Sequence, residues 1–250
     1  MKTLLIVGAT SAMAEASLNI WLKQGFDKAI LVARNSEKLN IVAGDARVRY
    51  QGKTQIESVI TDFDDSVAIQ NVLNKICSEN ETVDTALIAH GSLIDNEKCI
   101  KDYDLLAKEV YATATSPVLF LEGIVAKMQD QGFGHVGIIG SVAGDRGRLT
   151  NYIYGASKGF IELYCQGVQH KLQNLNSKVT LTLIKPGPTA TPMTRTITGK
   201  GKLADVTSVA KSIVKAVNKG KTVLYVPAKW RLIMLVIRNL PMFIFRKLKI

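Results

Sequence analysis

The sequence contains few of the residues that build small cross-linked or extended proteins. It has only three cysteines, Cys77, Cys99 and Cys165, with no CxxC pair and no cysteine–histidine cluster, and only six prolines in 250 residues. These scarcities exclude a disulfide scaffold, a cysteine-ligated zinc site and a collagen-like or proline-rich disordered chain. We therefore expect no metal site and reduced thiols in the core of a cytoplasmic protein.

The chain also lacks a long apolar segment at its N-terminus. The run Thr3–Val7 stops at Gly8, without the longer apolar region and cleavage site of a secretory signal. A run of this length is better interpreted as a first buried strand.

Acidic residues are missing from the last 22 positions, where six lysines and arginines lie. The whole chain carries a net charge of +11, but without these six charges the other 228 residues carry only +5. The excess of positive charge is therefore concentrated in the last 22 residues, and we expect no nucleic-acid partner.

What the sequence does contain is typical of one compact α/β domain, since 47% of its residues are hydrophobic and short apolar runs alternate with segments of helical periodicity. This pattern predicts a Rossmann-type, doubly wound parallel sheet of about seven strands over residues 1–228, followed by a basic apolar segment, 229–250. The predicted strands are Thr3–Val7, Ala29–Val32, Glu57–Thr61, Thr85–Ala89, Gly134–Ile139, Lys178–Ile184 and Thr222–Val226. The clearest predicted helices are Ala12–Gln24, Ser66–Glu79, Tyr103–Asp130, Asn151–Leu172 and Val206–Lys219. The polar stretch Thr194–Asp205 is predicted to be a mobile loop beside a binding site.

The first strand leads through a glycine turn into a helix, which is where a Rossmann domain binds a diphosphate. Gly8 supplies the turn, Thr10 and Ser11 offer hydroxyl groups, and Ala12 and Met13 open the helix. Ala12 and Ala14 replace the usual second and third glycines. Taken alone, the turn fits an ordinary strand–helix connection equally well.

The end of the second strand favours NADP(H) over NAD(H). It carries Arg34 and no acid, and an arginine here can accommodate the 2′-phosphate. The alternative is a solvated surface arginine. After the third strand, Asp62 and Phe63 are candidates for the adenine end of the cofactor, although Asp62 equally fits a helix cap.

Three residues form the strongest catalytic pattern. Ser141 follows the fifth strand, and Tyr154 and Lys158 stand four residues apart on a helix, so they share one face. The ammonium group of Lys158 can lower the phenol pKa of Tyr154, and Ser141 can donate to a substrate oxygen. Together they predict a site that interconverts a carbonyl and an alcohol.

With these motifs the chain resembles the short-chain dehydrogenase/reductase superfamily over residues 1 to about 227. The resemblance implies that Lys158 also binds the nicotinamide ribose and that Tyr154 contacts the cofactor. The turn KPGPTATPM then implies further cofactor contacts from Pro186, Gly187, Thr189 and Thr191. A homo-oligomer is also implied.

Two positions depart from the family's pattern. The family's Asn-Asn-Ala-Gly after the fourth strand is replaced by a segment ending in His90 and Gly91. His90 is a candidate cofactor contact, with a purely structural histidine as the alternative. The catalytic asparagine of the preceding helix has no clear counterpart, and Thr113 is nearest to it, with Tyr111 as the alternative.

The C-terminal segment KWRLIMLVIRNLPMFIFRKLKI is dense in large apolar residues but contains a central Arg-Asn-x-Pro. A membrane span is therefore improbable, and peripheral contact with the inner membrane face is favoured. The alternative is a segment that packs across the substrate cleft or a subunit interface.

The motifs GATSAMAE, AHG and SVAGDRGR, together with this segment, resemble the decaprenylphosphoryl-2-keto-erythro-pentose reductase-like branch and related polysaccharide-locus reductases. This implies a keto-sugar substrate, carried or not on a polyprenyl phosphate, with Arg146, Arg148, Lys200 and Lys202 near phosphate. The alternatives are a lipid or steroid carbonyl reductase and a catalytically silent NADP-binding regulator.

Overall fold

A parallel sheet of seven strands lies at the centre of the computed structural model, which describes residues 1–77, 82–194 and 203–248. The strand order is β3-β2-β1-β4-β5-β6-β7. The strands are β1 (Thr3–Val7), β2 (Lys28–Ala33), β3 (Gln55–Ile60), β4 (Thr85–Ile88), β5 (Gly134–Ile139), β6 (Val179–Pro186) and β7 (Val223–Val226). The predicted fold class is confirmed, and each predicted strand is present within two residues of its expected limits.

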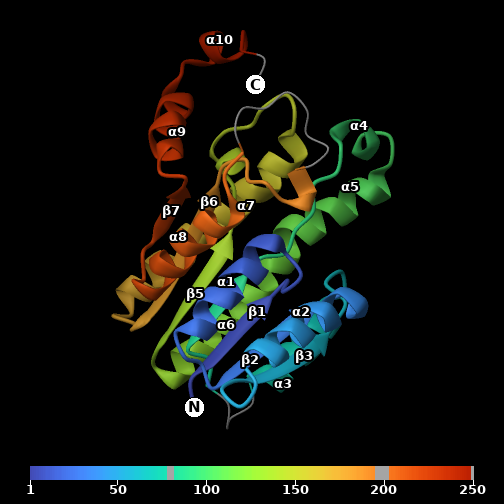
Figure 1. Cartoon of the computed structure of the whole chain (residues 1–250). Coiled ribbons are helices and arrows are strands. Elements are labelled where there is room, and N and C mark those ends of the chain that lie inside the picture. The colour runs from blue at the N-terminus through green and yellow to red at the C-terminus, as the bar shows by residue number, and fades with distance from the viewer. Residues whose placement is uncertain (78–81, 195–202, 249–250) are drawn as a thin grey trace.

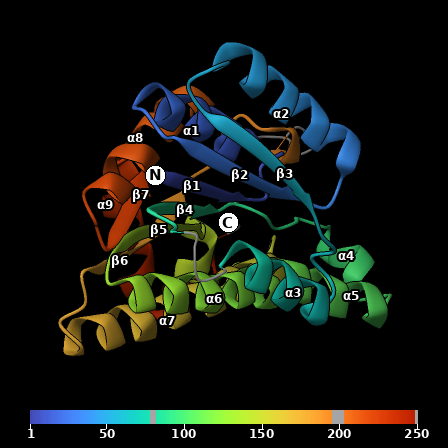
Figure 2. The ribbon, with the colours of Figure 1, turned by 90° about the horizontal axis from the view of Figure 1, so that it is seen from below.

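Helices cover both faces of the sheet, as Figure 2 shows from below. One face is covered by α1 (Ala12–Lys23), α2 (Ser36–Arg49) and α8 (Val206–Asn218), and the other by α3 (Ser66–Ile76), α6 (Ser116–Gln131) and α7 (Tyr152–Asn174). Trp21 is fully buried in the first core layer and Phe120 in the second. Because both faces are covered, β1, β2 and β4 are buried along their whole length.

The predicted helix Tyr103–Asp130 is wrong as one regular element. It consists of α5 (Tyr103–Val110), a π-helical turn η1 (Tyr111–Thr115) and α6, which follow one another directly. Apolar periodicity cannot reveal a single extra residue in a helical turn. The short helix α4 (Asn96–Cys99) precedes α5, and the predicted end of the third helix at Glu79 lies outside the described residues.

Beyond the sheet, the segment from residue 229 forms α9 (Lys229–Asn239) and α10 (Met242–Phe245), which extend past the end of the domain in Figure 1. One face of α9 packs on the protein: Met234 is fully buried, and the indole of Trp230 covers Gly187 so closely that a Cβ there would lie 1.9 Å from its Nε1. No helix within the described ranges is long and apolar enough to cross a membrane.

An arginine from the loop after β5 ties this segment to the domain. Nη1 of Arg146 donates to the carbonyl oxygens of Ile237 and Leu240, at 2.6 Å each, and its guanidinium lies 3.9 Å from the ring centroid of Phe245. These contacts place a cation at the C-terminal end of α9, where it is favourable. Arg146 is therefore engaged by the C-terminal segment, and its predicted place near a substrate phosphate is wrong.

Candidate active site

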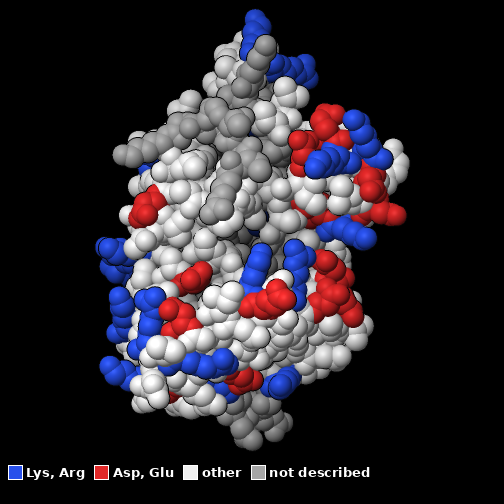
Figure 3. Space-filling model, turned by 45° about the vertical axis from the view of Figure 1, so that its right-hand side comes forward, with Lys and Arg blue, Asp and Glu red and all other residues white. Residues whose placement is uncertain are grey.

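A cavity of about 280 Å³ opens at the carboxyl ends of β1 and β4, where the strand order reverses. Open parallel sheets bind their ligands at such a point. Figure 3 shows the surface hollowed beside the lobe that carries α4 and α5. The cavity is lined by Gly8, Thr10, Ser11, Ala12, Met13, Ala33, Arg34, Phe63, Ala89, His90, Gly91, Ser92, Ala112, Ile139, Gly140, Tyr154, Lys158, Pro186, Thr191, Pro192 and Met193.

The turn after β1 brings the backbone close to the loop after β4. Gly8 has a φ of +79°, and a Cβ on it would lie 2.7 Å from the backbone nitrogen of His90. Only glycine fits this position without strain. Ser11 is the N-cap of α1 but makes no side-chain cap hydrogen bond, so its hydroxyl and the helix N-terminus face the cavity without an internal acceptor.

Two of the three residues predicted for the adenosine end reach the cavity. Arg34 and Phe63 line it, and Arg34 is exposed, with Nη1 3.7 Å from a carboxylate oxygen of Asp64. Asp62 is exposed, does not line the cavity, and accepts a hydrogen bond from the backbone N–H of Asp64. Asp62 therefore shapes the turn after β3, while Asp65 is the N-cap of α3.

His90 packs in an aromatic cluster and also lines the cavity, so its contact with a cofactor stays a prediction. Its ring packs 4.4 Å from that of Phe63 and 5.4 Å from that of Phe120, and Nε2 is 3.0 Å from Oγ of Ser116. It also lines the cavity, where its buried Nδ1 has no partner among the described residues. Burial, aided by the charges of Lys158 and Arg34, lowers its pKa to about 3, so the imidazole is neutral.

The structure brings Ser141, Tyr154 and Lys158 close together beside the cavity. Ser141 follows β5, its Oγ accepts from the backbone N–H of Ala143 at 3.0 Å, and it hydrogen-bonds Tyr154. Lys158 is buried, lies 5.7 Å from the ring centroid of Tyr154, and donates to the carbonyl oxygen of Ile139 at 3.0 Å. Of these three, Tyr154 and Lys158 line the cavity.

Burial shifts both titratable groups of the triad. The pKa of Lys158 falls to about 8 because burial disfavours the ammonium group, although the carboxylate of Glu109 opposes this shift. The pKa of Tyr154 rises because of burial, while its hydrogen bond with Ser141 acts in the opposite direction. A neutral phenol beside a lysine that titrates near neutrality is suited to donate a proton.

The turn after β6 forms a compact wall of the cavity. The hydroxyl of Thr194 donates to the carbonyl oxygen of Thr189, 2.6 Å away, and accepts from the backbone N–H of Thr191 at 3.0 Å. Pro186 and Thr191 line the cavity, whereas Thr189 is buried behind it and Gly187 lies under Trp230. No sequence motif predicts this role of Thr194, because it depends on the shape of the turn.

Thr113 lies in η1, fully buried beside the triad. Its Oγ1 accepts from the backbone N–H of Ser92 at 3.0 Å and lies 3.4 Å from an oxygen of Glu109. The alternative, Tyr111, has a buried hydroxyl without a partner among the described residues. Sequence reasoning missed Glu109 and Ser92, since neither belongs to a motif.

These features fit a dinucleotide. The N-terminus of α1 suits a diphosphate, the exposed Arg34 suits a ribose phosphate, and His90 lines the cavity with a buried Nδ1 that has no partner among the described residues. No group of three or more His, Cys, Asp or Glu residues able to hold a metal occurs in the described part of the chain.

Known proteins resemble this chain in sequence. Residues 2–202 match the family model described as short chain dehydrogenase. An uncharacterised oxidoreductase of Mycobacterium tuberculosis is 28% identical over 219 residues, covering 88% of this chain and 86% of that protein. An uncharacterised oxidoreductase of Streptomyces coelicolor is 28% identical over 251 residues, covering 99% and 96%.

Solved structures share the fold. A short-chain dehydrogenase from Sphingobium yanoikuyae in complex with NADPH matches with a TM-score of 0.79 at 16% identity, covering 97% of each chain. A short-chain dehydrogenase/reductase from Burkholderia phymatum in complex with NAD matches with a TM-score of 0.82 at 18% identity, covering 94% and 92%.

Proposed function

The chain belongs to the short-chain dehydrogenase family and is an NAD(P)-dependent oxidoreductase, and from this premise we propose that it reduces a ketone to an alcohol with NADPH. One observation carries the proposal. Ser141 hydrogen-bonds Tyr154, and Tyr154 and Lys158 line the same cavity as the N-terminal residues of α1. A bound nicotinamide dinucleotide supplies the hydride.

The protein's own residues supply the proton and the polarisation. A ketone oxygen placed between Ser141 and Tyr154 receives two hydrogen bonds, which strengthen as negative charge develops on that oxygen. Tyr154 then gives up its proton to this oxygen. The nearby ammonium group of Lys158 favours the phenolate that remains.

The test is NADPH oxidation by the purified protein with a panel of ketones that includes keto-sugars. Turnover that depends on Tyr154 supports reduction. If the protein binds NADPH and neither the wild type nor Tyr154→Phe oxidises it with any ketone, the chain is a silent NADP-binding protein and the proposal fails.

The preference for NADPH follows from Arg34, which stands at the end of β2 with its guanidinium exposed at the cavity. We expect Arg34→Ala to lower kcat/KM for NADPH about 10- to 100-fold and to change that for NADH by less than about twofold, because a charge-assisted contact with the 2′-phosphate is lost. Initial rates with both cofactors measure this. Arg49→Ala, an exposed arginine on α2, is the matched control. Equal losses for both cofactors would contradict the assignment.

The substrate that fits best is a keto-sugar with a phosphate group, free or linked to a lipid. This class rests on the resemblance of several motifs. Arg148, on the loop between Ser141 and Tyr154, has a buried Nε without a partner among the described residues, and burial lowers its pKa, but it is not among the residues that line the cavity. The predicted contacts from Lys200 and Lys202 lie outside the described residues.

The C-terminal segment supports contact with an anionic lipid surface. While Trp230 and Met234 face the protein, the opposite side of α9 and α10 exposes large apolar residues, and no acid occurs after residue 228. Lys and Arg gather at the tip of the molecule in Figure 3. The exposed apolar residues are Leu232, Ile233, Leu235, Val236, Met242, Phe243, Ile244 and Leu248. Such a surface is typical of interfacial helices.

The lipid contact is best tested by substituting the exposed apolar residues of α9 and α10. Deleting the whole segment would also expose Gly187 and release Arg146. We expect the triple variant Leu232→Ser, Leu235→Ser and Phe243→Ser to reduce co-sedimentation with anionic vesicles at least about tenfold, since apolar area no longer enters the lipid. The control is Ile41→Ser with Val48→Ser, two exposed apolar residues of α2. Undiminished sedimentation of the triple variant would contradict the proposal.

A further inference from the structure

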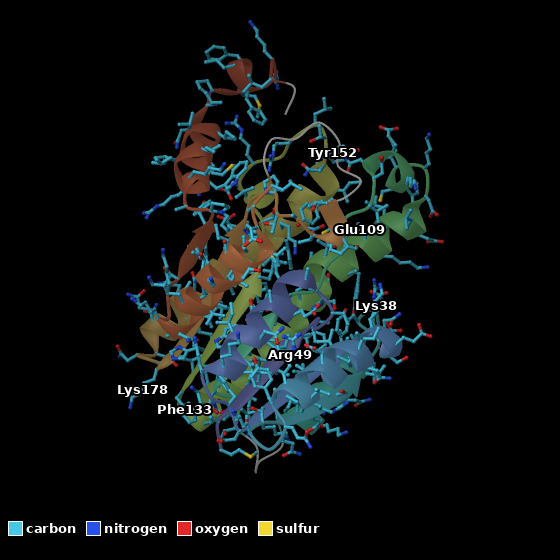
Figure 4. All side chains as sticks on the ribbon, in the orientation of Figure 1. Lys38, Arg49, Glu109, Phe133, Tyr152 and Lys178 are labelled. Atoms are coloured by element: carbon cyan, nitrogen blue, oxygen red, sulfur yellow. The ribbon has the colours of Figure 1, made fainter. Side chains whose placement is uncertain are left out.

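A carboxylate that belongs to no motif is buried next to the triad. Glu109 is the penultimate residue of α5, is only 2% exposed, and is separated from η1 by Val110 alone. Figure 4 shows it on α5, near the point where that helix approaches the end of the sheet. Burying a carboxylate is costly unless hydrogen bonds or a nearby cation compensate, so its surroundings indicate what it does.

One hydroxyl group binds this carboxylate directly, and a second lies near it. Oγ of Ser92 donates to Oε2 of Glu109, while Oγ1 of Thr113 lies 3.4 Å from Oε1 and 3.2 Å from the carbonyl oxygen of Ser92, its nearer acceptor. Ser92 and Thr113 are also joined to each other, because the backbone N–H of Ser92 donates to Oγ1 of Thr113 at 3.0 Å. The loop after β4 and the π-helical turn η1 therefore meet on Glu109.

This cluster borders the catalytic lysine across Gly91. A Cβ built on Gly91 would lie 3.3 Å from Nζ of Lys158 and 3.9 Å from Oγ1 of Thr113, so both groups face the same small space beside the glycine. Gly91 itself has no side chain to place between them, and the negative charge of Glu109 acts on Lys158.

We propose that Glu109, held by Ser92 beside Thr113, is a positioning residue that keeps Lys158 positively charged and thereby takes the place of the family's missing asparagine. The role rests on the proposed ketone reduction at Tyr154. In this arrangement Lys158 is the cation that compensates for the burial of the Glu109 carboxylate. The neutral hydroxyl of Thr113 then need not replace the asparagine by itself.

The electrostatics of the cluster agree with this role. Burial lowers the pKa of Lys158 to about 8, and among the charged groups the carboxylate of Glu109 opposes this shift most strongly. Four titratable groups near the pair carry no charge near pH 7, since burial holds the pKa of His90 at about 3 and raises those of Cys99, Cys165 and Tyr154. Of these, Tyr154 and Cys165 belong to α7, His90 follows β4 and Cys99 belongs to α4. The further acids in these surroundings are Asp95 and Asp102, the N-caps of α4 and α5, whose charges act on Cys99.

The first experiment is the pH dependence of kcat/KM for ketone reduction. We expect Glu109→Gln to move the alkaline limb about 0.5–1 pH unit lower, because Lys158 loses its proton more readily without the carboxylate. Glu109→Asp keeps the negative charge but places it one methylene group farther away. Its alkaline limb should therefore lie between those of Glu109→Gln and wild type. The control is Glu97→Gln, an exposed acid on α4 with the same charge change.

A second experiment follows Lys158 without turnover. A lysine whose pKa is about 8 when folded and about 10.4 when unfolded binds fewer protons in the folded state between these values, so stability rises with pH across this window. Lys158→Met removes that rise. The urea midpoint is measured against pH for wild type and Glu109→Gln, and each is compared with the same protein carrying Lys158→Met. The rise in the midpoint that depends on Lys158 should begin about 0.5–1 pH unit lower in Glu109→Gln than in wild type.

The outcomes separate the two proposals. If no ketone is reduced by the wild type, the proposed function fails, while the stability titration still decides on Glu109. If both the alkaline limb and the onset of the stability rise are the same in Glu109→Gln, Glu97→Gln and wild type, Glu109 does not set the charge of Lys158. Should Glu109→Gln fail to fold, Glu109→Asp replaces it, and the absence of any shift overturns the proposal.

Discussion

Tyr154→Phe should lower kcat/KM for ketone reduction by about 10²- to 10⁴-fold, the contribution of a positioned general acid. Removing the hydroxyl leaves the developing alkoxide without its proton donor, while Ser141 still offers one hydrogen bond. The cavity keeps its shape, because phenylalanine has the same ring. Initial rates with a ketone that the wild type reduces measure the loss, and NADPH affinity should change less than about threefold, since only one of the lining side chains is altered.

The chain offers a close control for this substitution. Tyr152, labelled in Figure 4, stands two residues earlier on α7, and it is exposed. Tyr152→Phe should retain at least about half of the wild-type rate, because surface substitutions away from special features have small effects. If Tyr154→Phe kept more than about a tenth of the wild-type kcat/KM, Tyr154 would not be the proton donor.

Gly8→Ala should destabilise the protein by about 3 kcal/mol and weaken NADPH binding. Part of the loss is the strain of a side chain at a φ of +79°, about 1–2 kcal/mol. The rest arises because the new Cβ would lie 2.7 Å from the backbone nitrogen of His90, so the loops after β1 and β4 must separate. Urea unfolding measures the stability, and fluorescence titration measures the affinity.

Gly25 isolates the first of these two contributions. It has a φ of +85° at the end of α1, but a Cβ on it would meet nothing within 4 Å. Gly25→Ala should therefore cost only about 1–2 kcal/mol and leave NADPH affinity unchanged. Equal losses of stability at the two glycines would show that the loops after β1 and β4 do not need their close approach.

Much of the sheet could be predicted because its strands are apolar on both sides. The run Thr3–Val7 is buried at every residue, and such runs stand out from polar surroundings. The helix Ser36–Arg49 was not among the clearest predicted helices, since its sequence is mostly polar and it buries only Leu39, Val42, Ala43 and Ala46. Its N-cap Asn35, which accepts from the backbone N–H of Lys38, is the local signal that marks its start.

The C-terminal segment shows why one pattern left two interpretations open. A helix rich in apolar residues on several sides can meet protein and lipid together, and composition does not say which side meets which. The structure turns Trp230 and Met234 inward and Leu232, Leu235 and Val236 outward. The partner of the inward face, Gly187, lies 43 positions before Trp230 in the chain, so no local pattern connects them.

The sequence by itself determined the doubly wound sheet, the glycine turn after β1, the arginine at the end of β2 and the Ser141, Tyr154 and Lys158 triad. These features depend on local periodicity and on fixed spacing between residues, and both can be recognised in the sequence. Tertiary structure alone decided that Asp62 lies away from the cavity, that Arg146 holds α9, and that Glu109 is buried beside Lys158. The physical reason is that burial and electrostatic coupling depend on which distant segments pack together. Both effects act on the pKa of Lys158.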